Sequence, residues 1–515
     1  MHDRRRFLKA LAALGFAASA PAHAQLNAKP RFAAYPFTLG IASGYPGSAS
    51  VNLWTRLAPV PDAPGGGMPP DIVPVLWEVA RDEAMKDLAA SGTAYATAEW
   101  GHSVHVEAAG LQANRPYFYR FSAGDAQSPV GRTRTAPGAG GKPQRLRFAY
   151  ASCQQYEQGY FGAYRHMAAD QPELVLHLGD YIYEGSWGRE HVRKHNAPEA
   201  ITLDDYRARY ALYKSDPDLQ AAHAASPWLV TWDDHEVVND YAADGADRLE
   251  APEWFLARRA AAYKAWYEHM PVPRRMLPVG PHMRIYARIV YGNLASFFML
   301  DNRQHRSAHA CPRPGRPGGS TVDAAQCADL QDAGRTLLGK RQEEWLHEGL
   351  GSSRQRWNLI AQQTLMSQFN RADGDGKSFW TDGWDGYPAA RRRLIEQMAK
   401  TSNPVVIGGD LHAFYVSQLK ADFDDPGSPV VASEFVGTSI SSQHGAQEWL
   451  DKRRVANPHV LLADGRHRGY TRVEITPKRM QVDLRAMESV QTRDAACNTI
   501  ASFVVEDGKP GPVRA

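Results

Sequence analysis

The chain has 515 residues, 43% hydrophobic and 22% charged, a composition typical of globular proteins that excludes disordered, collagen-like and coiled-coil classes. Its 59 basic and 56 acidic residues give a net charge of +3, and residues 1–24 carry all of this excess. The remainder has no net basicity, so we expect no stable nucleic-acid complex, and no apolar run reaches the roughly 18 residues of a transmembrane segment.

Residues 1–24 have the features of an export signal. A basic start precedes an apolar stretch (Ala10–Ala20), and residues 22–24 fit the small-x-small pattern at which signal peptides are cleaved. Residues 4–9, Arg-Arg-Arg-Phe-Leu-Lys, resemble the twin-arginine signal. We therefore predict a mature start at Gln25, the twin-arginine translocase as export partner, and a periplasmic or secreted location. A general secretory signal is the alternative.

Residues 37–137 are predicted to form a small β-domain. Strand-like alternation with β-branched and aromatic residues occurs at Ser50–Thr55, Val73–Val79 and Ser103–Val106. The segment Leu111–Phe121 resembles the tyrosine-corner strand of fibronectin-like sandwiches. We expect an immunoglobulin- or fibronectin-like β-sandwich, followed by a Pro/Gly-rich linker over 136–143.

Residues 145–490 show a different pattern, in which short apolar strands alternate with helices, as in α/β sheets. The predicted strands are Arg147–Tyr150, Leu174–Leu178, Trp228–Trp232, Leu294–Leu300, Trp357–Ala361 and Val405–Ile407. Helices are predicted over Tyr160–Ala169 and Glu253–His269, and an antiparallel pair of strands over Tyr470–Ile475 and Met480–Arg485.

The cysteines allow few disulfides. Cys311 and Cys327 lie in a Pro/Gly-rich insertion, where a disulfide would tie down a long loop, and an exported protein can keep one. We therefore favour a Cys311–Cys327 disulfide. Cys153 and Cys497 have no obvious partner.

Metal-capable or phosphate-capable side chains follow five of the predicted strands. These groups are Ser152-Cys153, Gly179-Asp180-Tyr181-Ile182-Tyr183, Asp233-Asp234-His235-Glu236, Asp301-Asn302-Arg303 and Gly409-Asp410-Leu411-His412. Ligand sites in α/β sheets lie outside the carboxyl ends of the strands, so we expect one common site. Taken singly, Cys153 could be a buried small hydrophobe, Tyr183 a packing aromatic and Arg303 a surface charge, but five such strand ends favour a site.

The motifs Gly-Asp-x-x-Tyr at 179–183, Asp-Asp-His-Glu at 233–236 and Gly-Asp-Leu-His at 409–412 resemble those of the two-metal phosphoesterase superfamily. The superfamily usually opens with Asp-x-His, whereas this chain has Ser152-Cys153. In that difference, in the export signal and in the small β-domain, the chain resembles the alkaline phosphatase D (PhoD) family. The resemblance extends over nearly the whole chain. The resemblance implies a metallophosphoesterase-type α/β sandwich behind the β-domain, with Fe(III) and Ca(II) as cofactors.

The ligand chemistry suits these two cations. Thiolate and phenolate ligands favour ferric iron, and calcium prefers carboxylate oxygens. Under the resemblance, the iron ligands are Cys153, Asp180, Tyr183 and His412. Calcium would share Asp180 and also take Asp234 and Asp410, while Gln363 or Asn239 is a further candidate ligand.

The implied activity is hydrolysis of phosphate mono- and diesters by in-line attack of a metal-bound hydroxide. His235 would protonate the leaving alkoxide, and the guanidinium of Arg303 would contact phosphate oxygens. Phospholipase D-like or phosphotriesterase activity at the same site is one alternative. A non-catalytic, metal-stabilised surface-binding protein is another. The physiological ester is not determined, because specificity would lie in the insertions at 184–226 and 304–340.

Overall fold

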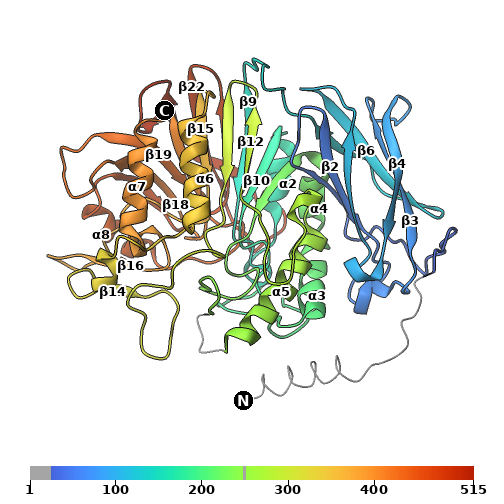
Figure 1. The fold of residues 1–515 in the computed structure, drawn as a ribbon, viewed down its shortest axis with the longest axis horizontal. Coiled ribbons are helices and arrows are strands. Elements are labelled where there is room, and N and C mark those ends of the chain that lie inside the picture. The colour runs from blue at the N-terminus through green and yellow to red at the C-terminus, as the bar shows by residue number, and fades with distance from the viewer. Residues whose placement is uncertain (1–24, 247–250) are drawn as a thin grey trace.

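Two large β-sheets lie face to face at the centre of the molecule in the computed structural model, which describes residues 25–246 and 251–515 (Figure 1). The ring of Phe148 in one sheet meets that of Phe297 in the other edge to face at 5.3 Å. The Tyr150 hydroxyl donates a hydrogen bond to the Phe435 carbonyl across the same interface at 3.0 Å. The predicted α/β sandwich is therefore confirmed, while the predicted export signal lies outside the described residues.

The first sheet has ten strands, with a parallel trio at its middle. Their order is β24 (Val513–Arg514), β23 (Cys497–Glu506), β22 (Arg479–Met487), β21 (Arg468–Ile475), β9 (Leu146–Ala151), β10 (Leu174–Leu178), β11 (Pro227–Thr231), β1 (Ile41–Gly44), β2 (Ser50–Arg56) and β5 (Ser103–Ala109). β9, β10 and β11 are parallel. Every residue of β10, Leu-Val-Leu-His-Leu, is buried, as in a parallel strand covered on both faces.

The second sheet has seven strands. Their order is β12 (Ala287–Tyr291), β13 (Ala295–Met299), β15 (Trp357–Ala361), β17 (Pro404–Gly408), β19 (Val430–Val436), β18 (Phe414–Lys420) and β20 (Val460–Asp464). β13, β15, β17 and β19 are parallel, and antiparallel strands flank them. Parallel strands of both sheets therefore lead directly into the polar segments that were predicted to form the site.

The N-terminal β-unit is continuous with the first sheet, which was not apparent from the sequence. β1 pairs in parallel with β11, so β1, β2 and β5 extend the ten-stranded sheet. A five-stranded sheet packs on them: β4 (Leu88–Ala96), β3 (Val73–Ala80), β6 (Pro116–Ala123) and β7 (Ala126–Gln127), with β8 (Gly131–Arg134) beside β6. The predicted strand from Leu111 begins at Pro116, because Asn114 adopts a φ of 55° in the preceding turn. The Tyr117 hydroxyl accepts the Gln112 backbone N–H at 2.8 Å, as in a tyrosine corner.

Helices cover the outer faces of both sheets (Figure 1). They are α2 (Gly162–Ala169), α3 (Leu203–Lys214), α4 (Pro217–Ala225) and α5 (Pro252–His269) on the side of the first sheet, and α6 (Lys340–Gly351), α7 (Pro388–Met398) and α8 (Gln447–Val455) on the side of the second. Local sequence sets their starts: Thr202 and Asp205 form a capping box at α3. Within residues 25–246 and 251–515, no helix has both the length and the apolar character that a bilayer span requires.

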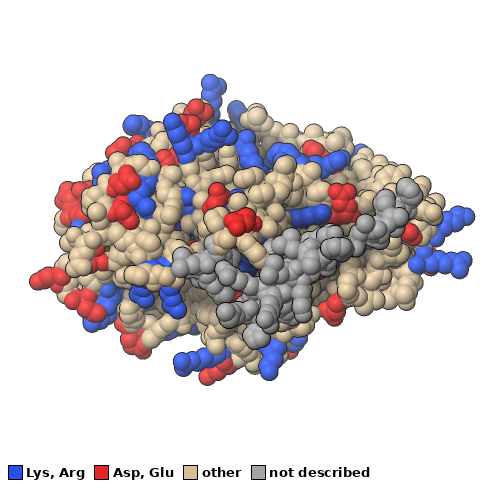
Figure 2. All heavy atoms as spheres, turned by 60° about the horizontal axis from the view of Figure 1, so that its bottom comes forward, with Lys and Arg blue, Asp and Glu red and all other residues tan. Residues whose placement is uncertain are grey.

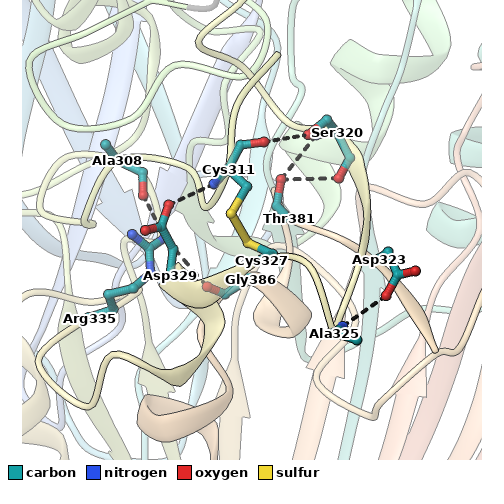
Figure 3. Close-up of a disulfide and its surroundings, with 10 residues drawn as sticks. All are labelled: Ala308, Cys311, Ser320, Asp323, Ala325, Cys327, Asp329, Arg335, Thr381 and Gly386. Atoms are coloured by element: carbon teal, nitrogen blue, oxygen red, sulfur yellow. Dashed lines mark hydrogen bonds between the residues drawn. A yellow bond between two sulfur atoms is a disulfide. The ribbon is translucent and has the colours of Figure 1, made fainter. Parts of the chain in front are cut away.

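The Cys311–Cys327 disulfide forms as predicted and braces the insertion between β13 and α6 (Figure 3). The same insertion contributes β14 (Thr321–Asp323), which pairs with β16 (Ser378–Trp380). Ser320 and Thr381 exchange hydrogen bonds beside the disulfide. The insertion is thereby attached to the segment that carries Trp380.

The described surface in Figure 2 carries both signs of charge. Lys and Arg are interspersed with Asp and Glu over the same face. This mixture agrees with the near balance of acidic and basic residues in the sequence.

Candidate metal centre

The carboxyl ends of the two large sheets meet at one place. The hydroxyl of Thr231 at the end of β11 donates to the carbonyl of Leu300, which follows β13, at 2.8 Å. The Trp232 indole N–H donates to Asp301 Oδ1 at 3.1 Å, and the Gln363 amide donates to the Trp232 carbonyl at 2.7 Å. These contacts bring the polar residues that follow the strands of both sheets to one site.

A first group of ligand-type atoms consists of the Cys153 thiol, an Asp180 carboxylate oxygen and a His412 ring nitrogen. All three lie within 4.8 Å of one another. The Tyr183 hydroxyl donates to Asp180 Oδ2 at 2.9 Å and lies 3.1 Å from His412 Nε2. The four residues predicted to hold iron therefore lie together in one cluster.

A second group contains Asp180 again, with Asp234 and His235. One ligand-type atom from each residue lies within 4.8 Å of the other two. Asp180 therefore belongs to both groups, which is the arrangement a bridging carboxylate needs. Asp410 lies outside both groups, and its Oδ2 accepts the Thr364 hydroxyl at 2.7 Å. Its role as a calcium ligand stays a prediction.

Four buried oxygens at this site have no hydrogen-bond partner. They are Asp180 Oδ1, Asp233 Oδ2, Asp234 Oδ1 and Gln363 Oε1. An ionised carboxylate oxygen or an amide oxygen can only accept, and leaving such an acceptor buried and unpaired costs about 1–3 kcal/mol, more when it is charged. Asp234 Oδ1 lies 3.4 Å from the Arg303 guanidinium, and Asp180 and Asp234 belong to the groups of ligand-type atoms, so unpaired acceptors at this place fit a metal centre.

The backbone is strained at the predicted ligands. Cys153, Asp180, Asp410 and His412 have φ values of 58°, 56°, 64° and 54°, in the left-handed region that non-glycine residues rarely adopt. Such conformations persist where the surrounding structure enforces them, and they cluster at functional sites. Gly179 beside them has a φ of 110°, and a Cβ added there would meet the Cβ of Asp233 at 2.5 Å.

Glu236 holds the two strand-end turns together. Its carboxylate accepts the backbone N–H groups of Asp180, Tyr181 and Asp233 at 3.0, 2.7 and 2.8 Å. Burial raises the pKa of Glu236 to about 8, against these N–H groups, which lower it. The sequence analysis assigned Glu236 no role, although its position three residues after Asp233 suits a carboxylate that caps a backbone N–H.

The tautomer of His412 follows from its surroundings. Nδ1 lies 2.8 Å from the Gln443 carbonyl, which can only accept, so Nδ1 carries the hydrogen and Nε2 presents its lone pair toward Tyr183. Burial lowers the pKa of His412 to about 3. A neutral imidazole oriented by a carbonyl is the form in which histidine binds metals.

His235 is held by a partner that the sequence analysis did not identify. Its Nδ1 lies 2.7 Å from Glu184 Oε2, in a salt bridge. Burial alone would lower the pKa of His235, but the charges of Glu184, Asp234 and Asp180 outweigh it and hold that pKa well above its usual range. These carboxylates favour the protonated form of His235, which suits a proton donor within the second group better than a metal ligand.

Arg303 has partners other than the phosphate oxygens that we expected. Its guanidinium pairs with Asp233, with Asp382 at 2.7 Å and with Asp234 at 3.4 Å, and only 1% of the residue is exposed. Asp382 also accepts from Arg306 at 2.6 Å. Three carboxylates therefore surround the guanidinium in this structure, and they engage donors that we expected to contact phosphate. A role of Arg303 in phosphate contact stays a prediction.

The other candidate ligands differ in their environment. Gln363 uses its amide nitrogen for three internal hydrogen bonds and keeps Oε1 free, which suits an oxygen ligand. The backbone N–H of Asn239 donates to Glu184 Oε1 at 2.9 Å, and its side-chain oxygen is not among the buried acceptors without a partner. Of these two candidates, the geometry favours Gln363.

Comparison with known proteins agrees with this geometry. A family model described as "PhoD-like phosphatase" matches residues 148–484, and one described as "PhoD-like phosphatase, N-terminal domain" matches residues 20–137. "Alkaline phosphatase D" of Bacillus subtilis (strain 168) is 46% identical over 525 residues, which cover 99% of this chain and 88% of that protein. The solved "Structure of PhoD" matches with a TM-score of 0.90 and 47% identity, over 94% of this chain and 93% of the other.

Proposed function

The chain belongs to the PhoD-like phosphatase family and is a phosphoric ester hydrolase, and we propose that it hydrolyses phosphate mono- and diesters at an Fe(III)/Ca(II) centre after export. The observation that carries the proposal is the sharing of Asp180 by two groups of ligand-type atoms. Two cations that share a carboxylate can clamp one phosphate group between them.

The residues present fit two different cations. Cys153, Asp180, Tyr183 and His412 would hold Fe(III), since this set contains a thiol and a phenol. Asp180, Asp234 and Asp410 would hold Ca(II), and the free Oε1 of Gln363 could complete the oxygen set. When bound, the two cations supply Lewis acidity toward a phosphate oxygen and lower the pKa of a water to yield the nucleophile.

His235 is the residue that we assign to proton transfer. Its Nδ1–H is engaged by Glu184, so the second ring nitrogen, Nε2, is the atom that would donate a proton to the leaving alkoxide. A leaving alkoxide is a strong base, and its protonation removes the charge that would otherwise develop on it. Glu184 orients the ring and favours its protonated form before the transfer, and the ring becomes neutral once Nε2 has given up its proton.

Two contacts support the residues on the iron side. The Trp187 indole stacks on His412 with ring centroids 5.6 Å apart and planes at 13°. The Ser442 hydroxyl donates to the Tyr183 hydroxyl oxygen at 2.8 Å and lowers the pKa of that hydroxyl, whereas burial raises it well above its usual range. Such surrounding contacts would orient the ligands of a bound metal.

The first test is hydrolysis of p-nitrophenyl phosphate and bis-p-nitrophenyl phosphate by protein with its metals measured. We expect both esters to be cleaved, EDTA to abolish turnover, and Tyr183→Phe to remove a visible phenolate–iron absorption band. Turnover that is unaffected by chelators, or a protein that binds metals but cleaves no ester, would overturn the proposal. Phosphatidylcholine and an aryl dialkyl triester, assayed alongside, address the phospholipase D-like and phosphotriesterase alternatives.

Export is tested separately. The twin-arginine string at residues 4–9 supports translocation of a folded, metal-loaded protein, which would let Cys153 bind iron while the thiol is reduced. Arg4→Lys combined with Arg5→Lys should leave active, uncleaved protein inside the cell. Appearance of that double variant outside, cut after Ala24, would show that a general secretory signal is responsible.

A further inference from the structure

Arg371 differs from other arginines near the centre in its lack of a polar partner. Its guanidinium makes no hydrogen bond or ion pair with any residue in 25–246 or 251–515, although the side chain is partly buried. By contrast, Arg303, Arg391 and Arg453 each lie within 2.7 Å of a carboxylate oxygen. A desolvated cation with no carboxylate in direct contact is costly, and burial lowers the pKa of Arg371, against the more distant charges of Asp385 and Asp410.

Two indole rings hold the guanidinium in place. The Arg371 Cζ atom lies 5.2 Å from the centroid of Trp380 and 5.4 Å from that of Trp449. Cation–π contacts use the face of a guanidinium and leave the N–H groups along its edge available. The donors of Arg371 are therefore positioned and unused, which is the state of an arginine that receives an anion.

The backbone around Arg371 is fixed. Its N–H donates to the Ser378 carbonyl at 2.8 Å, next to the β14–β16 pair. Asn370 Oδ1 accepts the backbone N–H groups of Ala372 and Ser378, each at 3.0 Å. The guanidinium is thus presented by an ordered turn, so little conformational entropy would be lost when a ligand binds.

Arg371 lies on the Asp410 side of the metal centre. The ring of Phe369, two residues before Arg371, meets Tyr415 edge to face at 5.6 Å, and Tyr415 follows His412 by three residues. The charge of Asp410 acts on both Tyr415 and Arg371. A Cβ added at Gly319 would meet Asp382 Cβ at 2.8 Å and Trp380 Cζ2 at 2.9 Å, so Trp380 lies beside the carboxylate that pairs with Arg303. Because Arg371 contacts Trp380, it is placed on this side of the centre.

We propose that Arg371, held between Trp380 and Trp449, forms an anion subsite that binds a second anionic group of the substrate, next to the phosphoryl group that reacts. This inference rests on the proposed function for the location of the reacting group. The guanidinium offers a pair of N–H donors, and a phosphate or a carboxylate supplies the two oxygens that accept them. A substrate with two anionic groups separated by a short linker fits it best.

The test compares p-nitrophenyl phosphodiesters of short alkanediols whose far end carries a hydroxyl, a phosphate or a carboxylate, over a series of linker lengths. We expect the wild type to prefer an anionic end at one linker length. Arg371→Gln should lower kcat/KM by about tenfold for anionic ends and leave the hydroxyl series unchanged. Arg371→Lys should retain part of the preference. If a phosphate end raises kcat/KM over the hydroxyl series more than a carboxylate end does, the group bound is a second phosphate. If both ends raise kcat/KM equally, the subsite accepts either oxyanion.

Arg454→Gln is the matched control. It removes the same charge from α8, which also carries Trp449, at an exposed residue outside the proposed subsite. We expect it to keep the wild-type preference, and the melting temperatures of all variants to agree. Equal loss on hydroxyl and anionic ends in Arg371→Gln, or no change in the preference, would overturn the subsite.

Binding affinities measured by calorimetry test the subsite independently of the proposed hydrolysis. An alkanediol bisphosphate should bind more tightly than the corresponding monophosphate, and Arg371→Gln should remove that difference. If the wild type binds in this way but cleaves no ester, the proposed function fails and the subsite stands. If it cleaves esters but binds both ligands equally, the subsite fails and the proposed function stands.

Discussion

Asp180→Asn is the most informative single change, because Asp180 belongs to both ligand groups. Asparagine keeps the shape of the side chain and one oxygen that can accept the Tyr183 hydroxyl, now 2.9 Å from Oδ2, so the fold should persist. The change removes the negative charge that both cations would share, and it replaces one of the two oxygens by an amide nitrogen that cannot coordinate. At roughly 1.5–3 kcal/mol for a contact with a charged group, the two losses total about 3–6 kcal/mol. At 1.36 kcal/mol per decade, kcat/KM should fall about 10²- to 10⁴-fold.

The assay is kcat/KM for p-nitrophenyl phosphate together with iron and calcium content. Cys153→Ser should lose iron and Asp234→Asn should lose calcium, whereas Asp180→Asn should lose part of both. Asp494→Asn is a matched control, since its side chain is 93% exposed and makes only a surface ion pair with Arg165. Asp180→Asn that retains both metals and more than a tenth of wild-type activity would refute the shared carboxylate.

Three further changes test the surroundings of the centre. Glu184→Gln should reduce kcat about 10- to 100-fold by releasing His235, with metal content unchanged; kinetics with metal analysis checks this, and unaltered kcat would contradict it. Glu236→Ala should lower the melting temperature and the iron content together, because three backbone N–H groups lose their acceptor. Thermal unfolding and metal analysis check this, and a variant with an unchanged melting temperature and full iron content would contradict it. Replacing Cys311 and Cys327 by Ser frees a loop with a sequence separation of 16 and should destabilise the fold by about 3 kcal/mol, measured by chemical unfolding, with activity retained below the melting temperature.

The parallel strands of the core could be predicted because their sequence signal is local. β10 is a five-residue apolar run with polar residues at its end, and the structure gives it the predicted bounds. The pairing of β1 with β11 could not be predicted, since it joins Ser43 to Pro227 across the chain and depends on packing rather than on either segment alone. Residues 136–143 form no helix or strand, and β1 before this segment pairs with β11 after it in one sheet.

The ligand-type residues of the centre were found for the same reason, because strand ends in parallel sheets converge. Their left-handed backbone was not foreseen, since neither Cys153 nor His412 is a residue that advertises a positive φ. Glu184 and Glu236 were missed because their roles depend on contacts to His235 and to three backbone N–H groups, which only the folded chain brings together.

Arg303 and Arg371 show that the sequence position of an arginine does not tell whether its N–H donors are free to bind a ligand. Arg303 follows a strand end, which made it the natural candidate for phosphate contact, but Asp382 arrives from a distant loop and, with Asp233, takes up its donors. Arg371 lies in a loop with no motif, and two tryptophans hold it without using its N–H groups. An arginine contributes to binding only through donors that the fold leaves unpaired, and that count is a property of the tertiary structure. Replacing Arg371 should therefore alter substrate preference, whereas replacing Arg303 should disturb the carboxylates and the metals that they would hold.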